Sequence, residues 1–137
     1  MKMLNLLVVA ALAAATPLCR GDSSESAAQA AAATWLALVD GGNYYQSWAT
    51  AADYFRNSIS RTQWVARVGA AREPLGALKE LRLLSAREAR SLPGAPDGDY
   101  VVIEYASRFV NKAEATETVT PVREPDGHWR VSGYFVR

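Results

Sequence analysis

The residues of this chain that could do chemistry are carboxylates and tyrosines rather than histidines or cysteines. His128 is the only histidine and Cys19 the only cysteine, so neither a Cys/His zinc site nor a disulfide within the chain is available. A Ser-His-Asp triad would have to use His128, which follows a predicted tight turn. The sequence contains no Gly-x-Ser-x-Gly elbow, no Gly-x-x-x-x-Gly-Lys phosphate loop and no Gly-x-Gly-x-x-Gly fingerprint. We therefore expect no metal site and no cofactor.

Glu117 and Asp53 are the candidate general bases, each with a tyrosine hydroxyl as the acid. If the last two strands pair across the turn between Glu124 and His128, Glu117 points toward the helices near Phe135, because strand side chains alternate. A slip or bulge of one residue would turn Glu117 outward. The sequence does not decide between the two orientations of Glu117, and we favour the outward or strand-end position.

Three arginines are candidates for binding an anion. Basic residues number 15 and acidic residues 14, a balance that argues against a nucleic-acid binder. The bases are concentrated between residues 56 and 92, where Arg67, Arg72 and Arg82 could line an anion-binding rim. The alternative, which we favour, is a set of solvated faces with weak exposed ion pairs.

The stretch GGNYYQSW, residues 41–48, allows two interpretations. It could form an aromatic wall of a ligand pocket, with Tyr44 and Tyr45, together with Tyr105 from a later strand, as candidate contacts. The interpretation that we favour is a joint between two helices, in which Gly41 or Gly42 has a positive φ and ends the first helix. Asn43, with Gln46, would then cap the second helix.

The pattern before residue 77 predicts about three helices. The first, roughly 22–39, would be capped by Ser24 or Ser26. The second, roughly 43–56, places four apolar residues on one face, which makes Trp48 a predicted core residue: Tyr44, Trp48, Ala51 and Phe55. The third begins at Ser60, with Gln63 completing a capping box, and ends before Pro74.

Strand patterns follow, separated by turns rich in Gly, Pro and Asp. We predict strands at 100–110, 115–122 and 128–137, and a further strand at 78–92, where a helix is the alternative. On the last strand, one face would carry Trp129, Val131, Gly133 and Phe135. The sequence therefore predicts an α+β fold with a four-stranded antiparallel sheet covered by the helices.

The N-terminal residues are typical of a secretory signal peptide. Lys2 precedes an apolar run to about Ala15, which is too short to span a membrane. We predict a signal peptide over residues 1–21, cleaved after residue 15 or 21, and a single domain over residues 22–137 without a transmembrane helix. Leu18 disfavours lipid attachment at Cys19. The expected location is the periplasm or the medium.

Four segments together resemble a family of small bacterial exported domains of unknown function: WLALVDGGNYYQSW, QWVARVGAAREPLG, LPGAPDGDYVVIEYASRFVNK and DGHWRVSGYFVR. The resemblance covers roughly residues 27–137 and implies no activity, cofactor or catalytic residue. At the level of fold it implies a cystatin-like or nuclear-transport-factor-2-like roll, in which a curved sheet wraps a helix, and such folds host many functions.

Two hypotheses of function follow. The first, which we favour, is a non-catalytic exported module that binds a small apolar ligand or a protein. The second is an enzyme with a pocket inside the roll and a carboxylate–tyrosine pair. A carboxylate and a tyrosine that converge inside a deep cleft would favour the enzyme, whereas a filled core would favour the binding module.

Overall fold

The computed structural model describes residues 20–137. Cys19 and nearly all of the predicted signal peptide lie outside these residues. In chain order the elements are α1 (Arg20–Asp40), α2 (Tyr44–Ala49), α3 (Asp53–Ser58), α4 (Arg61–Arg72), the 3-10 turn η1 (Glu73–Leu75), β1 (Leu78–Ala89), β2 (Asp99–Phe109), β3 (Lys112–Arg123) and β4 (Trp129–Val136). The predicted α+β class is confirmed. None of the described helices is long and apolar enough to cross a membrane.

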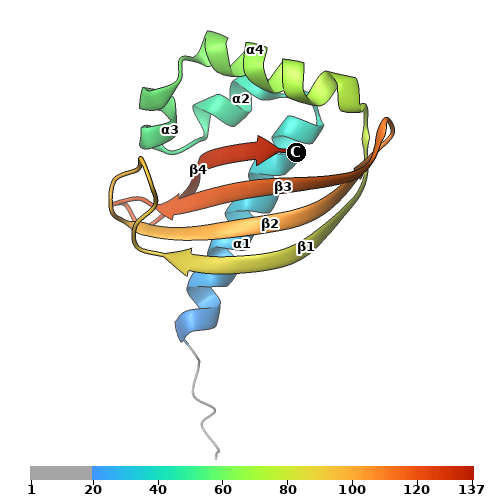
Figure 1. Ribbon diagram of the computed structural model, residues 1–137. Coiled ribbons are helices and arrows are strands. Elements are labelled where there is room, and N and C mark those ends of the chain that lie inside the picture. The colour runs from blue at the N-terminus through green and yellow to red at the C-terminus, as the bar shows by residue number, and fades with distance from the viewer. Residues whose placement is uncertain (1–19) are drawn as a thin grey trace, which may run out of the picture.

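The sheet is a four-stranded antiparallel meander in the order β1-β2-β3-β4. It is strongly curved, α1 crosses one of its faces, and α2, α3 and α4 lie along the β4 side (Figure 1). Residues 78–89 form the strand that the sequence predicted there rather than a helix, although it ends three residues earlier than residue 92. We call the face of the sheet that packs against the helices its inner face.

The first helix ends in a Schellman motif. Gly42 has φ of 75°, as predicted for one of the two glycines. The N–H of Asn43 donates to the carbonyl of Leu38 and the N–H of Gly42 to that of Val39. The predicted capping box at Asn43 is wrong, because the side chain of Asn43 makes no capping hydrogen bond. The predicted caps Ser24 and Ser26 are also wrong, since both lie inside α1.

The predicted second helix is broken in the middle. The backbone of Ala52 is extended, and its N–H donates to the carbonyl of Val131 on β4 at 2.8 Å. This tertiary hydrogen bond separates α2 from α3, so Tyr44 and Phe55 do not share one helix face. The capping box predicted at Ser60 is confirmed.

The stretch GGNYYQSW is a joint between helices that is held by one serine. Ser47 is fully buried, and its hydroxyl donates to the carbonyl of Tyr44 and accepts the indole N–H of Trp64 at 2.9 Å. The indole N–H of Trp35 donates to the carbonyl of Ser47 at 2.7 Å. Trp48 is half-buried against the core rather than fully enclosed, and its indole donates to the carbonyl of Ile59.

A bulge in β4 changes which of its side chains face the helices. Pro121 pairs with Val131 but Thr120 pairs with Gly133, so Ser132 is an extra residue. The alternation is therefore reversed beyond Ser132: Phe135 is exposed, contrary to prediction. The ring of Tyr134 instead lies 5.3 Å from that of Trp35 in the core.

We predict that Ser47→Ala destabilises the protein by about 1–3 kcal/mol, because the buried indole N–H of Trp64 loses its acceptor. Ser58→Ala is the matched control. The hydroxyl of Ser58 is exposed and bonds only to Tyr54, so its loss should cost under about 0.5 kcal/mol. Urea denaturation measures both, and equal midpoints for the two variants would show that the hydroxyl of Ser47 does not stabilise the position of Trp64.

Candidate functional site

Charged side chains and a tyrosine from four elements meet between the helices and the inner face of the sheet, and a serine of β2 joins them. Asp40 is the last residue of α1 and Arg72 is the last residue of α4. Glu117 lies on β3 and Tyr134 lies on β4. Glu117 is fully buried and Arg72 is 5% exposed. Burial of a charge without a partner would cost several kcal/mol, so the contacts among these side chains decide whether the fold tolerates them.

Glu117 lies on the inner face, contrary to the outward position that we favoured. The bulge lies on β4 and not on β3, so it moves Tyr134 inward without turning Glu117 outward. Both carboxylate oxygens are occupied: Oε1 accepts the hydroxyl of Tyr134 at 2.7 Å and Oε2 accepts the hydroxyl of Ser107 at 2.8 Å.

Arg72 supplies the positive charge that balances Glu117 and Asp40. Its Nη2 donates to Asp40 at 2.6 Å, and its Nη1 lies 3.5 Å from Oε1 of Glu117 and donates to the hydroxyl of Tyr134 at 3.3 Å. The guanidinium also stacks over the ring of Phe109, with 4.8 Å between its carbon and the centroid. Burial acts to lower the pKa of Arg72, but the hydrogen bond to Asp40 and the nearby negative groups raise it overall.

Two tyrosines beside Glu117 are held in their protonated form. Burial is the largest cause of the raised pKa of Tyr134, and the charge of Glu117 and the hydrogen bond to it add to the effect. Burial and the same charge raise the pKa of Tyr105. The hydroxyl of Tyr134 is therefore a hydrogen-bond donor to Glu117 at neutral pH.

The carboxylate–tyrosine pair required by the enzyme hypothesis exists as Glu117 and Tyr134, but the carboxylate is fully buried and only the tyrosine is partly exposed. A general base must be within hydrogen-bond reach of its substrate or of a bridging water. Glu117 is 0% exposed, and both its oxygens are already bonded to neighbouring side chains. The arrangement joins two helices to three strands, and neither oxygen of Glu117 is exposed to a reacting atom.

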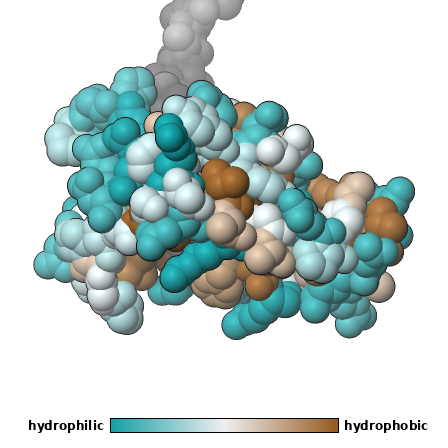
Figure 2. Space-filling view, turned by 90° about the horizontal axis from the view of Figure 1, so that it is seen from above, coloured by the Kyte–Doolittle hydropathy of each residue, from teal (hydrophilic) through white to brown (hydrophobic). Residues whose placement is uncertain are grey.

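An open groove lies next to this network, between α3, α4 and β4. Its volume is about 410 Å³, and Tyr134 forms part of its wall. Arg67 is the charged residue in its lining, and the apolar part comprises Phe55, Ile59, Trp64, Val68, Ala71, Phe135 and Val136. Seen from the side of α4, apolar side chains reach the surface between hydrophilic ones (Figure 2). The sequence identified Arg67 but not the apolar wall.

The other predicted ligand contacts do not converge. Arg72 is buried, and Arg82 lies on β1 beside Glu80 and Arg108, so the three predicted arginines do not form one rim. Tyr45 is exposed and stacks against the guanidinium of Arg61 at 4.7 Å. Tyr44 is half-buried against the core, and Tyr105 is buried.

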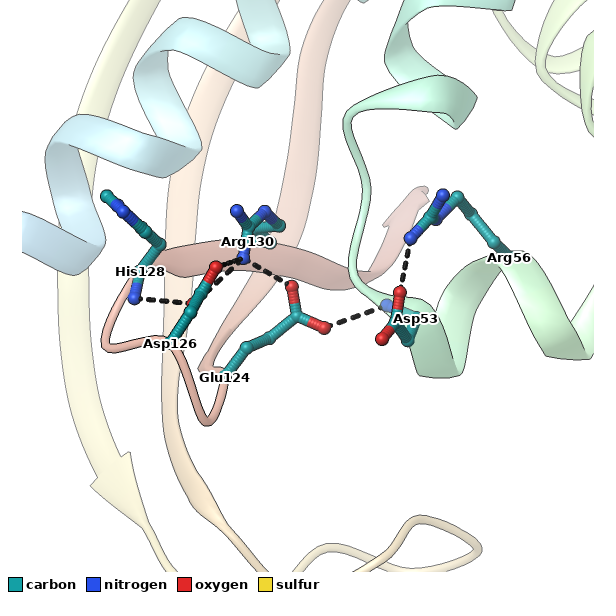
Figure 3. Close-up of polar contacts among 6 residues, drawn as sticks. All are labelled: Asp53, Arg56, Glu124, Asp126, His128 and Arg130. Atoms are coloured by element: carbon teal, nitrogen blue, oxygen red, sulfur yellow. Dashed lines mark hydrogen bonds and ion pairs between the residues drawn. The ribbon is translucent and has the colours of Figure 1, made fainter.

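Asp53 belongs to a second polar network on the surface (Figure 3). Its side chain pairs with Arg56, and its backbone N–H donates to Glu124 at 3.0 Å. Arg130 pairs with Glu124 at 2.8 Å and with Asp126 at 2.9 Å. The backbone hydrogen bond from His128 is the largest cause of the lowered pKa of Asp126. The network fastens the start of α3 to the β3–β4 turn.

The fold and the site define an α+β domain with a buried carboxylate and, beside it, an open and mostly apolar groove. Within residues 20–137, no group of three or more His, Cys, Asp or Glu side chains is arranged to hold a metal ion. The chain belongs to the family described as "Protein of unknown function (DUF4019)", whose model matches residues 31–134. The predicted membership of a family of unknown function is thus confirmed. No curated protein matches the sequence significantly.

We predict that Arg72→Met destabilises the protein by about 3–5 kcal/mol, because Glu117 is left buried without a cation. The double variant Arg72→Met/Glu117→Gln should recover at least about 1 kcal/mol of that loss, since the uncompensated charge is gone. Arg130→Met is the control. Its side chain is 33% exposed, and both of its acidic partners also accept backbone N–H groups, so it should cost about 1 kcal/mol. Urea midpoints that are additive for Arg72 and Glu117 would contradict the coupling.

Proposed function

We propose that this domain is a non-catalytic, exported binding module that takes a small anionic amphiphile in the groove between α3, α4 and β4. The single observation that carries the proposal is the lining of that groove, in which Arg67 is the charged residue beside an apolar wall. The apolar N-terminal segment, residues 3–15, supports export.

The size of the groove supports a small molecule as the occupant. Small-molecule sites have volumes of roughly 300–1,000 Å³ and are mostly apolar, with a few polar groups that fix orientation. At about 410 Å³, this groove falls at the lower end of that range. Phe135 is 52% exposed along it, so an apolar ligand would cover a ring that water now contacts.

The charge of the groove supports an acidic head group. Arg67 is exposed on α4, and no acidic residue belongs to the groove lining. A guanidinium binds a carboxylate or a phosphate through two parallel hydrogen bonds. An alkyl chain would then lie against Ile59 and Phe135 while its acidic end meets Arg67.

The carboxylates support binding without catalysis. Both oxygens of Glu117 are hydrogen-bonded inside the core. Asp53 is exposed and paired with Arg56, at the start of α3. Neither residue belongs to the lining of the groove.

We predict that decanoate binds saturably to the purified domain in isothermal titration calorimetry, and that decanol binds more weakly. Arg67→Gln should weaken decanoate binding about fivefold, the order of one exposed ion pair, and leave decanol binding unchanged. Arg82→Gln is the matched control, because it removes the same charge from β1, outside the groove. Ala71→Phe should block both ligands by filling the groove.

Two results would contradict the proposal. Equal affinity of decanoate for the parent, Arg67→Gln and Ala71→Phe would place any binding elsewhere. Chemical conversion of the ligand, seen by mass spectrometry after incubation, would favour the enzyme with a carboxylate–tyrosine pair instead.

A further inference from the structure

The strand β1 is an open edge of the sheet. Among the described residues it is hydrogen-bonded in the sheet to β2 alone, whereas the opposite edge strand, β4, also accepts the N–H of Ala52. Three leucines of β1 are exposed although they are apolar: Leu81 by 36%, Leu83 by 45% and Leu84 by 47%. An open edge with exposed leucines can accept another strand.

We propose that β1 pairs antiparallel with β1 of a second copy of this chain, around a two-fold axis between Leu83 and Leu84. In this register Leu83 lies opposite the partner's Leu84, and the reverse pair follows by symmetry. The leucines would form the apolar centre of the interface, and the two sheets would join into one continuous sheet.

The charges of β1 are self-complementary in this register. Its sequence is LKELRLLSAREA, residues 78–89. Glu80 lies opposite the partner's Arg87, and Lys79 opposite the partner's Glu88. Symmetry gives each pair twice, so four of the five charged residues of the strand meet an opposite charge. Opposite charges directly across a strand pair are stabilising.

Neighbouring registers are disfavoured by the same charges. A shift of one residue in one direction places Lys79 opposite the partner's Arg87. A shift in the other direction places Glu80 opposite the partner's Glu88. Because like charges across a strand pair repel, the sequence selects one register and resists unspecific pairing.

β1 has two bulges against β2, at Lys79 and at Leu84, and the bulge at Leu84 brings Glu80 and Arg87 onto the same face. Regular strands that pair around a two-fold axis match residues an even number of positions apart, since side chains alternate. Glu80 and Arg87 are seven positions apart, but Leu84 is an extra residue, because Leu83 pairs with Tyr105 and Ser85 with Glu104. Glu80 and Arg87 therefore both lie on the outer face, opposite Arg108 and Val102 of β2.

A single pair of strands buries little surface, so we expect a weak dimer that depends on concentration. Sedimentation equilibrium of the parent domain over micromolar to millimolar concentrations should show a monomer–dimer equilibrium. Arg87→Glu and Glu80→Lys should each raise the dissociation constant about tenfold, because two attractive pairs per dimer become repulsive. Both side chains are exposed, although Glu80 also pairs with Arg108 of its own sheet, so circular dichroism melting is needed to show that each variant folds.

The decisive test is an equimolar mixture of the Arg87→Glu and Glu80→Lys variants. One chain then carries two acids and the other two bases at these positions, so the heterodimer should form with the affinity of the parent. The control is a mixture of Glu114→Lys and Arg123→Glu, which change exposed charges on β3 and should behave like the parent throughout. A parent that remains monomeric at millimolar concentration overturns the proposal. The proposal is also overturned if the dissociation constant of the dimer is unchanged in the single variants, or if the mixture does not regain the affinity of the parent.

Discussion

Glu117 is a carboxylate enclosed between the sheet and the helices, and its compensation constrains four other elements. Removing such a group from water costs several kcal/mol unless its charge is balanced and its oxygens are bonded. Arg72 provides the charge, while Tyr134 and Ser107 bond the two oxygens. Arg72 also bonds Asp40, at the end of α1, so α1, α4, β2, β3 and β4 all have a side chain in the same network. The relative positions of the helices and the curved sheet are thus specified by polar contacts as well as by apolar packing.

Because Glu117 is part of the fold, the residues that stabilise the structure are largely different from those of the groove that we propose as the binding site. Glu117, Arg72 and Ser107 of the polar network are buried, and the groove beside it is open, mostly apolar and lined by a single charged residue, Arg67. Tyr134 belongs to both, since its hydroxyl bonds Glu117 and its side chain forms part of the groove wall. A ligand in the groove would therefore rest against a residue that is already hydrogen-bonded to the core, so its side chain would lose little conformational freedom on binding. The open edge at β1 is formed by other residues and is independent of the groove.

The features that the sequence predicted correctly are set by local interactions. The capping box at Ser60, the positive φ at Gly42 and the turns between the strands depend on residues close together in the chain. The features that it missed depend on distant partners. The break between α2 and α3 comes from the hydrogen bond between Ala52 and Val131. The predicted inward face of β4 is wrong beyond Ser132, because Ser132 is the extra residue of a bulge. Pro121 on the paired strand could have indicated this bulge, because proline cannot donate a hydrogen bond to the sheet and is found at bulges. Tyr134 could not be assigned to the Glu117 network without that register, and Ser107 and Asp40 depend in addition on the pairing of β2 with β3 and on the position of α1.

The measurement that tests the central claim most directly is carboxylate labelling of the native domain with a carbodiimide and an amine, read by peptide mass spectrometry. Glu114 and Glu117 lie on the same strand, but Glu114 is exposed and Glu117 is fully buried. The account predicts that Glu114 reacts readily in the native protein, while Glu117 reacts only after unfolding in urea. Labelling of Glu117 at the rate of Glu114 under native conditions would contradict the account of Glu117 as an enclosed structural carboxylate. It would show instead that a substrate could reach Glu117.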